Sequence, residues 1–208
     1  MAVSMQLSTV QHDALVELLN IGFGKAGASL SKLTGQRVLL EVPHVAVHPL
    51  DHLNAALSEI MTGDVASVHQ VFTGPVAGDA LLMLDPVGAA ILKELLTDEP
   101  ALPLELDATA REVLTEVGNV LLNACIGTFG NLLRVPIGFS VPDLDIARLH
   151  DIVARFTTEG DGFRYALVVT SAFRLRDSEV TGYVVIVLTV QSLTRLLIAL
   201  DAWERTQR

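Results

Sequence analysis

The side chains of this sequence that could do chemistry form two pairs, each made of an acid and an amide. Glu17 is followed by Asn20, and Glu116 is followed by Asn119 at the same spacing. Residues at this spacing lie on one face of a helix, so each pair would form a polar patch on an otherwise apolar helix. A carboxylate accepts hydrogen bonds, and a carboxamide both donates and accepts them. Each pair could therefore engage a polar group of a second molecule.

Each pair belongs to a stripe that is repeated in the two halves of the chain. Asp13 and Glu112 stand one helical turn before the pairs, and Pro43 and Pro142 follow them at one constant offset. Either stripe alone is explained by the solvated face of an amphipathic helix. Shared ancestry of the halves would also preserve some residues. Retention of both pairs among many diverged neighbours favours a function, because core packing does not require an exposed acid or amide.

At these residues the sequence resembles the CheC/CheX/FliY family of chemotaxis phosphatases, whose signature is Asp/Ser-x3-Glu-x2-Asn-x22-Pro. The signature occurs as Asp13, Glu17, Asn20 and Pro43 and, nearly, as Glu112, Glu116, Asn119 and Pro142. Glu112 is the one departure, since Asp or Ser is usual there. The resemblance covers almost the whole chain. Length and the presence of two motifs are closer to CheC than to CheX, which has one site per chain, or to FliY, which carries extra domains.

The resemblance implies hydrolysis of the aspartyl phosphate on a CheY-like receiver domain. It assigns Asn20 and Asn119 to orienting the attacking water, and Glu17 and Glu116 to an ion pair with the receiver's active-site lysine. The receiver holds the Mg²⁺ that neutralises the phosphoryl oxygens, so no metal or cofactor of the chain's own is expected. A CheD-like deamidase is a further partner that the resemblance implies, although no residue of the chain demonstrates it.

Other interpretations remain open. A non-catalytic adaptor or flagellar-switch scaffold of the same fold would bind receivers without hydrolysing anything. A small-molecule-binding α/β domain would rest on the glycine string at residues 22–27, which matches the dinucleotide fingerprint but follows a helical segment instead of a strand. His44, His48 and His52 are evenly spaced, but Pro49 breaks the helical register that would align them. A solvated strand and loop is expected there instead of a metal site.

The composition restricts the partners and the compartment. The chain has 208 residues and a formal net charge of -10, so nucleic acid and anionic lipid are not expected as partners. Its single cysteine, Cys125, excludes an internal disulfide and suits a reducing compartment. The N-terminus shows no signal-peptide pattern, and the hydrophobic stretch 183–200 is interrupted by polar side chains. A cytoplasmic protein without membrane insertion is therefore expected.

The periodicity predicts an α/β (α+β) fold made of two α-β-β-α-like repeats, 8–97 and 107–204, joined by a linker at 98–106. Long helices are expected to pack on a mainly antiparallel sheet in one pseudo-two-fold domain spanning 1–208, and Pro43 and Pro142 to shape the strand after each long helix. The expected helices are 9–33, 51–60, 87–96, 107–133 and 190–204. The expected strands are 37–47, 65–72, 77–84, 134–146, 163–173 and 180–188.

Overall fold

The computed structural model describes residues 7–99, 107–157, 164–175 and 178–207. Most of the predicted linker, residues 100–106, lies outside the described residues. The described helices are α1 (Thr9–Thr34), the 3-10 helix η1 (Leu50–His52), α2 (Leu53–Ser58), α3 (Pro86–Thr97), α4 (Ala108–Leu133), α5 (Leu149–Thr157) and α6 (Val190–Gln207). The described strands are β1 (Val38–Pro49), β2 (Asp64–Thr73), β3 (Gly78–Leu84), β4 (Gly138–Phe139), β5 (Asp143–Arg148), β6 (Arg164–Leu175) and β7 (Ser178–Thr189).

The two long helices that carry the stripes begin at matched capping residues. At the start of α1, the Ser8 side chain accepts from the backbone N–H of Gln11, and the Gln11 side chain accepts from the backbone N–H of Ser8, both at 3.1 Å. At the start of α4, Asp107 accepts from the backbone N–H of Ala110 at 2.7 Å. Gly35 ends α1 with φ 68°, in the left-handed region that glycine adopts without strain. The predicted starts of both helices, and the stop of α1, are confirmed.

The sheet interlocks the two halves of the chain. The strand order is β1-β6-β7-β3-β2-β4, with β5 also paired to β2. β1 of the first half therefore pairs with β6 of the second, and β5 of the second pairs with β2 of the first. Every strand pair among the described residues is antiparallel. Together with the long helices, this confirms the predicted α/β fold class.

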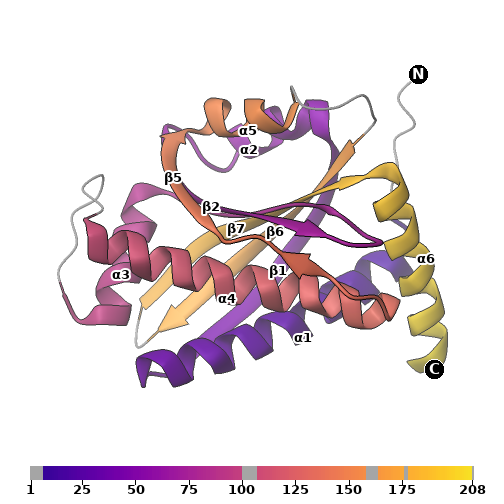
Figure 1. Ribbon diagram of the computed structural model, residues 1–208, viewed down its shortest axis with the longest axis horizontal. Helices are drawn as coiled ribbons and strands as arrows, with labels where there is room; N and C mark the ends of the chain where they lie inside the picture. Colours follow the sequence, from indigo (N-terminus) through magenta and orange to yellow (C-terminus); the bar gives the residue numbers. More distant parts are fainter. Residues whose placement is uncertain (1–6, 100–106, 158–163, 176–177, 208) are drawn as a thin grey trace.

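The helices cover both faces of the sheet (Figure 1). The long helices α1 and α4, with α3 and α6 at their ends, lie on one face, and α2 and α5 lie on the other. Alternation along each strand sends side chains to opposite faces. The first face buries the larger apolar cluster, which includes Leu19, Phe23 and Phe129. The second buries a smaller cluster that includes Leu57 and Ile152. Both stripes therefore belong to the layer with the larger core.

The second half departs from the predicted strand 134–146. The chain forms only the short β4 and then β5, and Pro142, which has no N–H to donate to a ladder, lies between them. Helix α5 was also missed by the prediction. Its apolar side chains at Leu149, Ile152 and Phe156 are buried against the sheet at helical spacing. The hydrophobic stretch 183–200 divides between β7 and α6, as predicted.

Helices α1 and α4 cross closely at Gly22. A Cβ atom at Gly22 would lie 2.7 Å from Thr128 Oγ1 and 3.1 Å from the backbone oxygen of Ala124. The glycine string at 22–27 thus lies inside α1 and permits helix packing, and it lacks the strand-to-helix position that the dinucleotide fingerprint requires. The contact places the two stripe-bearing helices side by side.

One described helix, α4, is long and apolar enough to cross a membrane by length and composition. More than half of its most apolar window is buried inside the protein, 56%. Its inner face packs on α1 and on β2, and it contributes Leu121 and Phe129 to the core. Core packing accounts for its hydrophobicity.

Candidate active site

The first stripe is exposed along α1. Asp13, Glu17 and Asn20 point away from the core, while the intervening Leu18 and Leu19 are buried. Among the described residues, none hydrogen-bonds or pairs with the Glu17 carboxylate. Glu17 is therefore available to a cation on another molecule.

Asn20 is held against β1 by one backbone hydrogen bond. Its Oδ1 accepts from the backbone N–H of Val42 at 3.2 Å. That N–H is free for a side chain because the β1–β6 register shifts between Glu41 and His44, and the next residue, Pro43, has no N–H. A carboxamide oxygen has two lone pairs, so Asn20 Oδ1 retains one. The bond also orients the exposed amide so that its Nδ2 points away from β1.

The second stripe lies on α4 and has a different environment. Glu112 and Glu116 are exposed, and Asn119 is half-buried. Asn119 Oδ1 accepts from Asn123 Nδ2 at 2.8 Å and from Gln70 Nε2 at 3.4 Å. Both lone pairs of this oxygen are therefore occupied within the protein.

The backbone of the second half fixes this amide network. Gln70 is buried on β2, and its Nε2 also donates to the backbone oxygen of Ser140 at 2.8 Å. A backbone oxygen can only accept, so the bond determines which end of the Gln70 amide faces Asn119. The Asn119 oxygen must then face Gln70 and Asn123. Val141, which corresponds to Val42, is 88% exposed and gives Asn119 no backbone donor.

The two amides meet the sheet near its opposite edges. Asn20 bonds to β1, one edge strand, and Asn119 bonds to β2, next to the other edge formed by β4 and β5. Because each acid lies one turn before its amide on the same helix, the structure brings each pair together and keeps the two pairs apart. Two separate partner molecules could therefore be engaged.

The chain is similar in sequence to two phosphatases of Bacillus subtilis. No family profile matches the chain. Over 208 residues the chain is 23% identical to the CheY-P phosphatase CheC of Bacillus subtilis, covering 97% of this chain and 99% of that one. Over 142 residues it is 25% identical to the flagellar motor switch phosphatase FliY of the same organism, covering 67% of this chain but only 36% of FliY. The chain is thus similar to CheC over almost its whole length and to FliY over part of it.

Solved structures show the same fold. The FliY crystal structure from Thermotoga maritima matches with a TM-score of 0.77 at 21% identity, covering 95% of this chain and 99% of that one. FliM in the FliG–FliM complex from H. pylori matches with a TM-score of 0.63 at 12% identity, covering 92% and 99%. The chain thus shares its fold with FliY and with FliM of the FliG–FliM complex.

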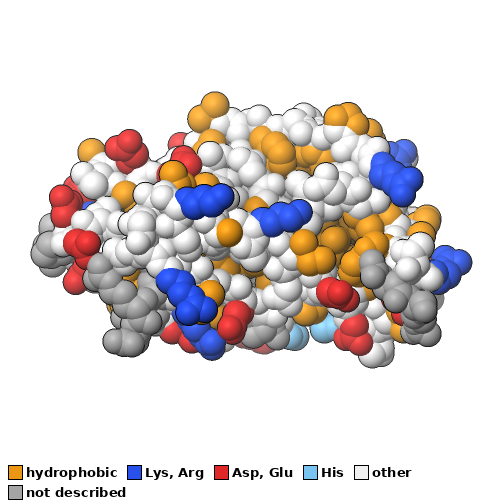
Figure 2. Space-filling model, turned by 90° about the horizontal axis from the view of Figure 1, so that it is seen from below, with side chains coloured by type: hydrophobic (Ala, Val, Ile, Leu, Met, Phe, Trp, Pro, Cys, Tyr) orange, Lys and Arg blue, Asp and Glu red, His pale blue; other side chains and the backbone are white. Residues whose placement is uncertain are grey.

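An apolar groove adjoins Glu116 on α4. It has a volume of about 210 Å³ and is lined by Leu30, Leu33, Thr34, Leu96, Val113, Glu116 and Val117. The first stripe is flanked by helix α6 instead of by a groove. Gln11 Nε2 donates to Asp201 of α6 at 3.2 Å, and Trp203 of α6 packs on the core. On the face seen from below α1, apolar side chains are interspersed with acidic and basic ones (Figure 2).

Gln70 and Asn123 were not singled out by the sequence. Asn123 had a signal, since an amide one turn after Asn119 can bond to it along the helix. Gln70 had a weaker one, because it takes an inward position in the alternation of β2, where its neighbours Val68 and Phe72 are buried. Its partner on α4 could not be deduced without the fold.

The other titratable candidates contribute no metal centre among the described residues. Within the histidine series, burial lowers the pKa of His48, and the neighbouring His44 and His52 add to this while Glu59 opposes it. Cys125 is fully buried in α4, and burial raises the pKa of its thiol well above the usual range. Cys125 therefore fills the core, as expected of a small apolar residue.

Proposed function

We propose that this CheC/FliY relative hydrolyses the aspartyl phosphate of a CheY-like response regulator. The observation that supports this most is the state of Asn20. Its carboxamide is exposed, is fixed by the Val42 N–H at 3.2 Å, and keeps one acceptor position, one turn from a Glu17 carboxylate that pairs with no described residue. The relative CheC is itself named as a CheY-P phosphatase.

In the proposed reaction, a water oxygen attacks the phosphorus while the bond from phosphorus to the receiver's aspartate oxygen breaks. The products are inorganic phosphate and a free aspartate carboxylate. Asn20 or Asn119 orients the water, which requires hydrogen bonding and no shifted pKa. The receiver's Mg²⁺ neutralises charge on the phosphoryl oxygens, so this chain supplies no metal ligand.

The acids are proposed to dock the receiver. Glu17 and Glu116 would each pair with the lysine of a receiver's phosphorylation site. A lysine side chain has an apolar stem and a charged head, and the groove beside Glu116 offers apolar walls next to a carboxylate. The second stripe therefore suits the acid's role better than it suits the amide's.

A scaffold function is the second candidate. The likeness to FliM of the FliG–FliM complex supports it at the level of the fold. The occupied Asn119 oxygen also fits a site that binds without catalysing. A CheD-like deamidase as a further partner stays a proposal that no described residue supports.

The decisive experiment follows the loss of phosphate from a purified, phosphorylated CheY-like receiver with Mg²⁺. The proposal expects faster loss when this protein is added, and weaker binding of the receiver by the Glu17→Gln/Glu116→Gln variant. Receiver binding without any acceleration would leave the scaffold function in its place. A CheD-like partner is tested separately, by mixing the two purified proteins and measuring complex formation.

A further inference from the structure

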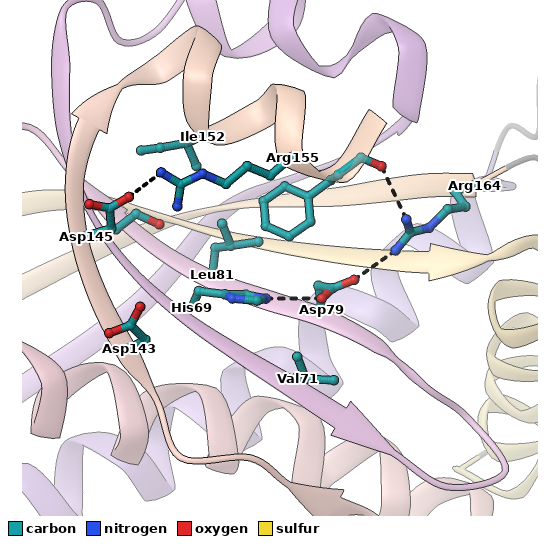
Figure 3. A pocket seen from close by; sticks show the side chains of 11 residues that line it. His69, Val71, Asp79, Leu81, Asp143, Asp145, Ile152, Arg155 and Arg164 are labelled. Carbon is teal, nitrogen blue, oxygen red and sulfur yellow. Dashed lines mark hydrogen bonds and ion pairs between the residues drawn. The ribbon is translucent and has the colours of Figure 1, made fainter. Parts of the chain in front are cut away.

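A polar cavity lies on the face of the sheet opposite the two stripes. It has a volume of about 280 Å³ and is enclosed by β2, β3 and β5, by α5, and by the first residue of β6 (Figure 3). Its apolar lining includes Val71 and Leu81 from the sheet and Ile152 from α5. Charged side chains from three strands and from α5 point into it.

One wall of the cavity is a closed ion-pair network. Asp79 binds His69 Nε2 with one oxygen at 3.1 Å and Arg164 Nη2 with the other at 2.8 Å. The His69 ring meets the Phe156 ring edge-on, with centroids 5.3 Å apart. Arg164 also donates to the backbone oxygen of Phe156 at 3.2 Å. The network ties α5 to the sheet and leaves neither oxygen of Asp79 unpaired.

The opposite wall keeps acceptor groups that the protein does not use. Arg155 pairs with one oxygen of Asp145. Asp143, the next residue of β5 on the same face, makes no hydrogen bond or ion pair with a described residue. Ser67 lies deeper, with 2% of its surface exposed, and its hydroxyl has no partner in the described part of the chain. An unpaired buried hydroxyl is costly, so a molecule held in the cavity is expected to complete it.

The fold does not need polar side chains at this position. Leu81 and Val185 occupy equivalent positions, three residues after Gly78 and Gly182 of the repeated sequence. Leu81 pairs with His69 and Val185 pairs with Val168, so Val168 is the counterpart of His69 in the other half. By the same register, Ala166 is the counterpart of Ser67. Both counterparts are buried in an apolar cluster. Burying ion pairs offers little stability over apolar packing. The polar side chains at His69 and Ser67 are therefore better explained by a ligand.

We propose that this cavity binds a small organic cation, an ammonium or guanidinium group on a short apolar chain. The lining carries three carboxylates and two guanidinium groups, so one negative charge is left over when His69 is neutral. Asp143 would neutralise the cation, the Ser67 hydroxyl oxygen would accept a hydrogen bond from one of its N–H groups, and the apolar lining would cover the ligand's alkyl chain. The cavity holds the volume of about nine water molecules, which limits the ligand to a small molecule.

The test uses n-butylguanidinium as the probe and isothermal titration calorimetry on the whole protein. The control ligands are pentanoate, which has a similar length but the opposite charge, and 1-pentanol, which is neutral. The proposal expects saturable binding of butylguanidinium with a Kd of about 1 mM or tighter and at least tenfold weaker binding of the other two. No saturable binding of butylguanidinium, or preferential binding of pentanoate, overturns it.

Matched variants locate the binding. Asp143→Asn is expected to weaken butylguanidinium binding about tenfold, whereas Asp64→Asn, an exposed acid on β2 outside the cavity, should leave it unchanged. Ser67→Ala provides a second probe and is expected to weaken binding a few-fold without loss of stability, since its hydroxyl makes no bond to lose. Binding that survives both Asp143→Asn and Ser67→Ala would show that the cation binds elsewhere and would overturn the proposal. Because the cavity lies on the opposite face of the sheet from the stripes, the Asn20→Ala/Asn119→Ala variant should bind the probe normally.

Discussion

The two stripes repeat one motif, but the first half has the more accessible amide and the second half has the better-placed acid. In the first half the amide is open, since Asn20 Oδ1 accepts one backbone bond and keeps one lone pair. In the second half the acid is better placed, since Glu116 lies beside an apolar groove, while the Asn119 oxygen is filled by Gln70 and Asn123. The two halves share the acid and the amide of each pair without sharing their surroundings.

The strand that follows each helix accounts for the difference between the amides. β1 runs on past Pro43 with a register shift that leaves the Val42 N–H for Asn20. The corresponding strand of the second half breaks into β4 and β5 around Pro142. Gln70 then fills the place of the missing backbone donor, and it ties Asn119 to the segment before β5. The same proline therefore has different consequences in a continuous strand and in a broken one.

The largest expected effect separates the two amides by activity. Asn20→Ala should lower the rate of receiver dephosphorylation about tenfold, because it removes the amide whose oxygen can still accept from water. Asn119→Ala should lower the rate less than about twofold. The measurement is phosphate release at saturating receiver. Equal losses in the two variants would mean that the occupied oxygen of Asn119 does not limit its site.

The next effect separates the two acids by affinity. Glu116→Gln should weaken receiver binding by about tenfold, and Glu17→Gln by only a few-fold, because the groove beside Glu116 desolvates the ion pair. Receiver affinity is measured with each single variant, and Glu112→Gln serves as an exposed acid on the same helix that should change little. A larger effect at Glu17 would contradict the role given to the groove.

Freeing the second amide should restore part of its activity. In a chain that carries Asn20→Ala, the further change Asn123→Ala removes one donor from Asn119 Oδ1 and should raise the remaining rate about threefold. Gly24 is the counterpart of Asn123 in the first half and has open space around it. Gly24→Asn in an otherwise unchanged chain is therefore the reciprocal variant, and a rise in its rate would argue against the lone-pair explanation.

The last effect is on stability and concerns Gln70. Gln70→Val gives β2 the residue that β6 has at the corresponding position, Val169, and removes the bonds to Asn119 and Ser140. The free energy of unfolding should fall by about 1 kcal/mol, since the lost bonds are partly offset by removing an amide oxygen that has no partner. Denaturant unfolding measures this, and Val169→Ala, expected to cost about 1 kcal/mol or more through a cavity, is the comparison in the other half.

Local sequence signals predicted a large part of this fold. The Ser8 capping box, the stop at Gly35 and the apolar spacing of the long helices depend on neighbouring residues, so they could be read along the chain. The break in the second strand and the partners of Asn119 depend on which strands pair across the halves, and spacing along the chain does not determine this. Helix α5 was predictable from its repeat counterpart, since the first half has a short helix at the same place.

The position of each acid and amide on its helix was predicted, but the difference between the two pairs was not. The motif placed an acid and an amide on one face of each helix, and the structure agrees with that placement. Whether an exposed amide is available depends on hydrogen bonds to residues distant in sequence, such as Val42 and Gln70. The cavity around Asp79 was not predicted, because its residues come from four separate segments with no common spacing.

The central claim is that the two amides carry out the hydrolysis, and the variant Asn20→Ala/Asn119→Ala tests it directly. The account predicts that this variant binds the phosphorylated receiver with unchanged affinity and leaves its rate of phosphate loss at the level of the receiver alone. Asn131→Ala, an exposed amide near the end of α4, should retain the full rate. Undiminished dephosphorylation by the double variant, with its fold intact, would contradict the account.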